Sequence, residues 1–95
     1  MAYILEQATK KIPGEMLCHE GVLRLKALDE QNGSDYIKTL KTFLDNHQNV
    51  VHTANTLYIH RSTLLYRLER IKETIGSELT DPDELLYLGI SLRLL

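Results

Sequence analysis

Residues 60–71 read HRSTLLYRLERI, and the spacing of the apolar residues in this stretch decides the fold. The large aliphatic residues that start here recur at intervals of four, three and four: Leu64, Leu68, Ile71 and Ile75. This is the pattern of one buried face of an α-helix. Gly76 follows as a residue suited to a left-handed helix cap. The sequence therefore predicts a long helix over residues 61–75.

Four further helices are expected, and no segment alternates polar and apolar residues as a strand would. The first covers residues 13–31, where a proline opens the helix and Asn32-Gly33 closes it. The second follows Ser34, whose hydroxyl is expected to cap its first turn, and it ends near Asn46.

Residues 49–75 have the form of a helix-turn-helix unit. Asn49 is expected to cap a short third helix. The inward-facing residues of this helix are expected to be Ala54, Leu57 and either Val50 or Val51. Three residues then form the turn: Tyr58, Ile59 and His60. The small Ala54 lets the two helices approach closely, and Ile59 fills the angle between them.

The last helix is expected to begin at the sequence DPDE, residues 81–84. Asp81 suits the N-cap, Pro82 the first helical position, and Glu84 a carboxylate that reaches back as in a capping box. This helix is apolar almost all round, so it should be sandwiched, either centrally or against a second chain.

The whole chain is accordingly expected to be all-α, a compact bundle of about five helices containing a helix-turn-helix. Residues 1–33, with a short helix within 1–12, would be an N-terminal helical connector, and residues 34–95 the helix-turn-helix domain.

Length and composition are those of one small globular domain. The chain has 95 residues, of which 43% are hydrophobic and 25% charged. No apolar run approaches the roughly 18 residues of a membrane span, and the start MAYILEQATKK lacks the order of a secretion signal. Cys18 is the single cysteine, which fits a reducing compartment. A cytoplasmic location without membrane contact is expected.

The net charge of −2 is unevenly distributed. Residues 60–75 carry four basic and two acidic residues, whereas residues 76–95 carry one basic and four acidic residues. Binding depends on the charge of one face and not on the sum over the chain. The basic helix is therefore a candidate surface for a negatively charged partner, although its arginines could also form an ordinary solvated face, steadied by pairs such as Arg70 with Glu73.

The first turn of the long helix favours a surface for a negatively charged partner over an ordinary solvated face. Helices that enter the DNA major groove read bases with residues near their N-terminus. Base contacts are expected from the polar residues of this end: Arg61, Ser62 and Thr63. Phosphate contacts are expected from the neighbouring helix start and from residues further along: Asn49, Thr53, His60, Arg67 and Arg70. Arg67 has an alternative role as an ion-pair partner of Asp45 or of an acid in the last helix.

Three pieces of the sequence together resemble one known family. TANTLYIHRSTLLYRLERIKETIG and DPDELLYLGISLRLL are similar to the C-terminal helix-turn-helix domain of PucR-type (CdaR-like) bacterial transcriptional regulators, and LCHEGVLRLKALDEQNGSDYIKTLKTFLDN resembles the connector that precedes it. The resemblance implies a DNA-binding output domain of a longer regulator, whose upstream sensory portion is absent from this chain. It also implies that the recognition helix begins at His60-Arg61, with base contacts from Ser62, Thr63 and Tyr66 and with Arg67 and Arg70 at the basic positions of the motif.

One position departs from the usual pattern of such units. Helix-turn-helix turns often contain glycine where this chain has Tyr58. Either Tyr58 accepts a strained backbone or the turn differs slightly.

Other classes of function find less support in the sequence. The four histidines, His19, His47, His52 and His60, are not spaced to place two imidazoles on one helix face, so no metal and no cofactor is expected. No phosphate-binding loop or nucleophile motif indicates an enzyme. The main alternative is a helical dimerisation or protein-interaction module without DNA binding. A homodimer is compatible with both, because helix-turn-helix proteins often bind DNA in pairs.

Overall fold

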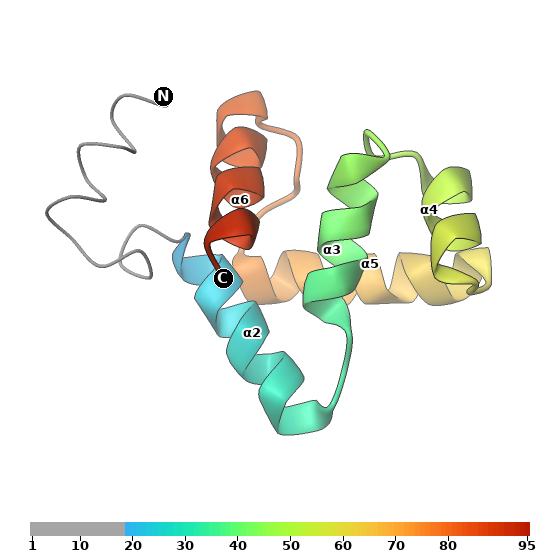
Figure 1. The fold of residues 1–95 in the computed structure, drawn as a ribbon, viewed down its shortest axis with the longest axis horizontal. Coiled ribbons are helices and arrows are strands. Elements are labelled where there is room, and N and C mark those ends of the chain that lie inside the picture. Colours follow the sequence, from blue (N-terminus) through green and yellow to red (C-terminus); the bar gives the residue numbers. More distant parts are fainter. Residues whose placement is uncertain (1–18) are drawn as a thin grey trace, which may run out of the picture.

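The structure is a computed structural model that describes residues 19–95 of the chain. These residues form five helices and no strand: α2 (Glu20–Asn32), α3 (Tyr36–Asp45), α4 (Val50–Leu57), α5 (Arg61–Ile75) and α6 (Pro82–Leu94). Figure 1 shows α5 along the longest axis, with α4 at its N-terminal end and α2 toward its C-terminal end. The predicted all-α, five-helix fold is confirmed. The predictions for residues 1–12 and Cys18 lie outside the described residues. The first predicted helix does not start near Pro13, because the helix that ends at Asn32 begins at Glu20.

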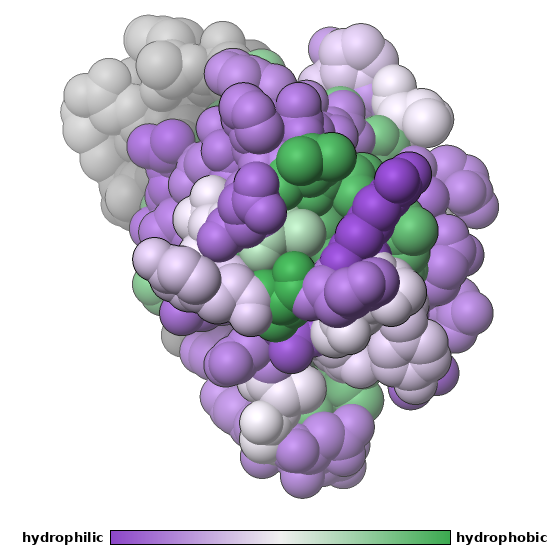
Figure 2. Space-filling model, turned by 90° about the vertical axis from the view of Figure 1, so that its right-hand side faces the viewer, coloured by the Kyte–Doolittle hydropathy of each residue, from purple (hydrophilic) through white to green (hydrophobic). Residues whose placement is uncertain are grey.

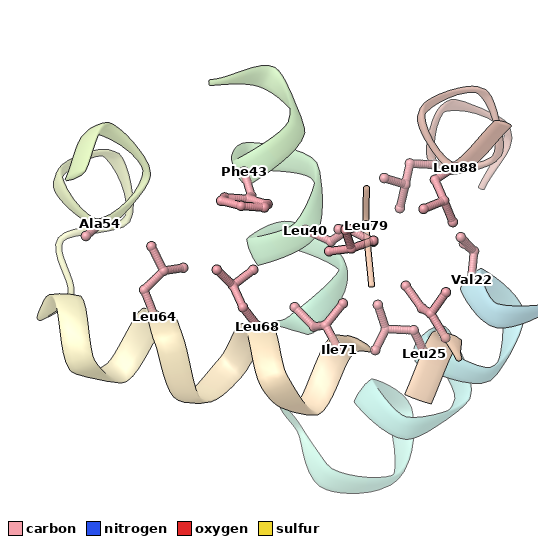
Figure 3. Close-up of a cluster of buried hydrophobic side chains, with 12 residues drawn as sticks. Val22, Leu25, Leu40, Phe43, Ala54, Leu64, Leu68, Ile71, Leu79 and Leu88 are labelled. Atoms are coloured by element: carbon pink, nitrogen blue, oxygen red, sulfur yellow. The ribbon is translucent and has the colours of Figure 1, made fainter. Parts of the chain in front are cut away.

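The core is organised around the apolar stripe of α5. Leu64 points toward Ala54 of α4, and Leu68 lies near Phe43 of α3 (Figure 3). Further along, Ile71 lies near Leu40 and Leu79 (Figure 3). All four residues of the predicted stripe are buried. The long helix has the predicted bounds, and its apolar spacing places one buried face against the helices that pack on it.

Two helix ends were predicted from glycine. Gly33 has φ 64° at the C-cap of α2 and Gly76 has φ 77° at the C-cap of α5, a left-handed conformation that glycine adopts without steric cost. Both predicted stops are therefore confirmed. At the other end, α2 begins at Glu20, where His19 is the N-cap and its Nδ1 accepts a hydrogen bond of 2.9 Å from the Gly21 amide.

The start of α3 corrects a prediction. Ser34 does not cap this helix, and Asp35 occupies the N-cap without a side-chain hydrogen bond. The cap comes instead from Asp29 of α2, whose carboxylate accepts from the amides of Tyr36 at 3.0 Å and Ile37 at 2.8 Å. Ser34 donates its hydroxyl to the same carboxylate. A carboxylate at this position is also stabilised by the positive end of the helix dipole.

Helix α2 packs into the same core as the other four helices. Its Val22 and Leu25 are completely buried. Its first turn lies against the C-terminal end of α5, and Arg24 donates hydrogen bonds of 3.0 Å to the carbonyl oxygens of Thr74 and Ile75. These bonds satisfy acceptors that the end of α5 would otherwise leave free. Helix α2 therefore packs against α3 and also against α5, the second helix of the helix-turn-helix.

The last helix differs from its prediction in two ways. Asp81 caps it as expected, by accepting from the Asp83 amide at 3.0 Å, with Pro82 in the first turn. Glu84 does not reach back to complete a capping box, because its carboxylate accepts a hydrogen bond from Ser77. The helix is also not packed centrally within the chain: it buries Leu88, Ser91 and Leu92 against α2 and α3, whereas other apolar residues of this helix and its C-cap are exposed, namely Leu86, Tyr87 and Leu95. The alternative, that this helix meets a second chain, stays a prediction.

Candidate nucleic-acid interface

The turn between α4 and α5 has the predicted length and residues. Helix α4 ends at Leu57, Tyr58 is its C-cap, and His60 is the N-cap of α5. Tyr58 has φ 55° and ψ 42°, so it accepts the left-handed backbone in which glycine is more usual. Ile59, half-buried, packs against the core as predicted. Of the two alternatives, the structure thus shows the usual turn with a strained backbone at Tyr58, and not a turn of different conformation.

Asn49 and His60 are the N-caps of the two helices. The Asn49 Oδ1 accepts from the His52 amide at 2.9 Å, which confirms its predicted capping role. The His60 Nδ1 accepts from the Ser62 amide at 3.1 Å and lies 2.8 Å from the Ser62 hydroxyl. In neutral imidazole, an Nδ1 that accepts from an amide places the ring hydrogen on Nε2. His60 therefore carries a free donor on the opposite side of its exposed ring.

The four predicted base-contacting residues all lie on the exposed side of the first turns of α5. They are Arg61, Ser62, Thr63 and Tyr66, and the ring of Tyr66 is 63% exposed. Only Ser62 has a side-chain partner among the described residues, its neighbour His60. Arg61 makes no ion pair within residues 19–95. These four side chains are thus accessible from outside, and none of them except Ser62 is held by another side chain of the described residues.

The predicted phosphate contacts divide into three groups. Asn49 and His60 are exposed at helix starts. Arg67 and Arg70 lie further along α5 and have partners: the half-buried Arg67 donates to the Thr39 hydroxyl of α3 at 3.3 Å, and Arg70 pairs with Glu73 at 3.6 Å. Among the described residues Arg67 has no ion pair with Asp45 or an acid of α6, so that alternative is wrong.

Thr53 is the clear correction. Its side chain is completely buried, and its hydroxyl donates to the Asn49 carbonyl at 2.7 Å, one helical turn back. A buried and already bonded hydroxyl cannot reach a phosphate. The prediction was wrong because a threonine near the start of a helix can either face the solvent or be buried against neighbouring helices, and Thr53 is buried.

Negative charge is unevenly distributed along α4, the turn and α5. Residues 46–68, which span α4, the turn and the first half of α5, contain no aspartate or glutamate. Carboxylates return only at Glu69 and Glu73, which pair with Lys72 at 3.6 Å and with Arg70. The exposed second half of α5 is therefore close to neutral, while nothing offsets Arg61 at its start.

Figure 2 views the end of the molecule formed by α4 and the start of α5. Apolar surface gathers in the middle of this face, and hydrophilic residues surround it. The exposed apolar and aromatic side chains of these two helices and their turn are Val51, Tyr58, Leu65 and Tyr66. Val51 is 55% exposed, so Val50 is the inward residue of the two. The sequence did not single out Tyr58, Leu65 or Asn55 as candidate contacts, although all three are exposed. A helical projection of α4 would have placed Asn55 on the exposed side of that helix.

The described part of the chain meets the requirements of neither a metal site nor a membrane-spanning helix. Residues 19–95 contain no group of three potential metal ligands. No helix among them is long and apolar enough to cross a membrane. His19 is occupied within the fold, with its ring 5.2 Å from that of Tyr87 and its Nε2 3.5 Å from Glu84.

A short helix, a three-residue turn and a longer helix form a helix-turn-helix, the unit that defines one class of DNA-binding domains. The chain belongs to the family described as the PucR C-terminal helix-turn-helix domain, which matches residues 36–94. Membership of this family implies a DNA-binding, regulatory role for the chain. The resemblance stated from the sequence is thus confirmed.

The curated relatives are longer regulators. The chain is 34% identical over 76 residues to the purine catabolism regulatory protein of Bacillus subtilis (strain 168), which covers 80% of this chain and 14% of the relative. It is 38% identical over 71 residues to the carbohydrate diacid regulator of Escherichia coli (strain K12), covering 75% of this chain and 18% of the relative. For the proline-responsive transcriptional activator PutR of Bacillus subtilis the identity is 39% over 57 residues, covering 60% of this chain and 14% of the relative. No solved structure matches the chain.

Proposed function

We propose that the chain is the sequence-specific DNA-binding output domain of a bacterial transcriptional regulator, with α5 as the helix that enters the major groove. The observation that carries this proposal is the exposed polar start of α5, residues 61–63, where Arg61 has no ion pair among the described residues, within a stretch, residues 46–68, that has no carboxylate. A surface of this kind attracts the phosphate backbone and leaves polar side chains free for base edges.

Base recognition is assigned to four residues of α5. Arg61 can donate to O6 and N7 of one guanine together, and the methyl group of Thr63 can contact a thymine methyl. Ser62 and Tyr66 offer hydroxyl groups to base edges, with Ser62 oriented by His60 at 2.8 Å. The first turn of α5 is the part that such a helix inserts most deeply.

Phosphate binding is assigned to residues on both sides of the groove. The N-terminus of α4 at Asn49 presents free amides, and the His60 Nε2 presents a donor. Arg67 and Arg70 extend the contact along α5. Arg70 would exchange its partner Glu73 for a phosphate, and this exposed pair costs little to break.

The rest of the regulator and its assembly are also part of the proposal. Since the chain spans 14–18% of the length of the relatives named above, a sensory portion would precede it in a longer protein that acts in the cytoplasm, where the bacterial chromosome lies. A homodimer would place two α5 helices in successive major grooves, about 34 Å apart on one face of the duplex.

A second candidate is a helical interaction module that does not bind DNA. The observation in its favour is the exposed apolar side of α6 with Leu86, 50% exposed, and Tyr87, 40% exposed. Salt separates the two candidates. Affinity for DNA falls steeply with ionic strength because bound counterions are released, whereas association through apolar faces hardly weakens.

The test is to select duplexes from a random pool and to titrate them at two salt concentrations. Arg61→Ala should cost about 1–3 kcal/mol in binding and relax the sequence preference, whereas Arg70→Ala should weaken all duplexes alike and reduce the salt slope by about one. Arg93→Ala in α6 is the matched control, because it removes the same charge from another helix. Arg93→Ala should bind like the parent. If Arg61→Ala and Arg70→Ala also bound like the parent, the assignment of α5 would be wrong.

A further inference from the structure

Tyr58 combines two features that folding alone does not explain. Its side chain is 95% exposed, so the ring packs on almost nothing. Its backbone lies in the left-handed region, with φ 55°, which disfavours residues with a Cβ. A glycine would fit the same turn without strain.

The other non-glycine residues in this backbone region differ from Tyr58. Leu79, with φ 60°, is 2% exposed and belongs to the core. Gln48, with φ 62°, donates its side-chain amide to the Leu79 carbonyl at 2.8 Å. His47, with φ 54°, is one of the residue types that tolerate the region best. Among the four such residues in the described part of the chain, only Tyr58 lacks a structural reason for its place.

Its position suggests a role in binding. Tyr58 directly precedes Ile59 and His60, so its exposed ring stands beside the start of α5, in the stretch without carboxylates. Tyrosine hydroxyls are among the neutral groups that donate hydrogen bonds to DNA phosphates. We propose that Tyr58 is an additional DNA contact, with its hydroxyl bonded to a backbone phosphate at the edge of the groove that α5 enters. This proposal rests on the proposed function above.

Two variants separate the hydroxyl from the backbone strain. Tyr58→Phe removes only the hydroxyl, and Tyr58→Gly removes the whole side chain and relieves the strained φ. Tyr58→Phe should unfold at the temperature of the parent, and Tyr58→Gly at the same or a higher temperature. Each should nevertheless bind the selected duplex less tightly, by about tenfold for Tyr58→Phe, the scale of a hydrogen bond to a charged group, and by more for Tyr58→Gly.

Two further readouts identify a neutral phosphate contact. The salt slope should stay that of the parent, because tyrosine displaces no counterion. The loss should also be similar on selected and unrelated duplexes, since phosphates carry no sequence information. Tyr87→Phe, which removes a hydroxyl from α6, should bind like the parent.

The outcomes distinguish this proposal from the one on which it rests. If the parent bound duplexes with the expected salt dependence while both Tyr58 variants kept parental affinity, the contact would be overturned and the proposed function would stand. A loss confined to Tyr58→Gly would overturn the bond assigned to the hydroxyl. If Arg61→Ala, Arg70→Ala and the parent alike showed no salt-dependent binding, the proposed function would fail, and the Tyr58 contact with it.

Discussion

Replacing Asp29 should test the structural link between α2 and the helix-turn-helix. Its carboxylate accepts three hydrogen bonds at the start of α3, from the amides of Tyr36 and Ile37 and from the hydroxyl of Ser34. Asp29→Ala removes all three and leaves two amides at the start of α3 without a protein partner. Asp29→Asn keeps one acceptor oxygen but loses the charge.

The expected cost follows from the bonds. Loss of a helix cap typically costs about 1 kcal/mol, and the second amide and the hydroxyl add roughly the same again, so Asp29→Ala should lose about 2 kcal/mol of unfolding free energy. Asp29→Asn should lose about 1 kcal/mol, which includes the loss of the charge at the helix dipole. In a domain of this size, 2 kcal/mol corresponds to a fall in Tm of roughly 10 °C.

Thermal and urea unfolding followed by circular dichroism measure these changes. Asp35→Ala is the control, because Asp35 occupies the N-cap of α3 but makes no side-chain capping bond. It should change the stability by less than about 0.5 kcal/mol. A larger loss for Asp35→Ala than for Asp29→Ala would refute the reasoning, since the local residue would then be the true cap.

Two further predictions concern the packing of α2, and thermal unfolding tests both. An added Cβ at Gly21 would lie 2.8 Å from the side chain and 2.9 Å from the backbone of Ile75, so Gly21→Ala should destabilise by about 1–3 kcal/mol. Gly89→Ala in α6 meets nothing within 4 Å and should stabilise by about 1 kcal/mol; equal effects at the two glycines would contradict the packing. A chain shortened to residues 34–95 lacks Val22 and Leu25 of the core and should fail to unfold cooperatively, whereas a sharp transition would show that α2 is dispensable.

The elements of the fold could be predicted where their signals are local. The apolar spacing of Leu64 to Ile75 gave the bounds of α5, and Asn49 and Asp81 cap helices that begin at the next residue. The prediction for Ser34 failed because the cap of α3 comes from Asp29 on another helix. Such a partner is adjacent in space and not in the local pattern of the sequence.

The candidate site shows the same limit. The sequence identified the turn and the exposed start of α5, but not the burial of Thr53 or the bond between Arg67 and Thr39. Both depend on how α4 and α5 lie against their neighbours, which the composition of one helix does not reveal. The chain division at residue 33 stays a prediction, and the packing of Val22 and Leu25 favours a folding unit that includes α2.

The most direct test of the DNA-binding assignment is a map of amide chemical shifts in the isotope-labelled chain during titration with a selected duplex. The account predicts the largest changes at His60 to Tyr66 and in the first turn of α4, with little change along Pro82–Leu94. Large changes confined to α6, with the amides of Arg61 and Ser62 unmoved, would contradict it.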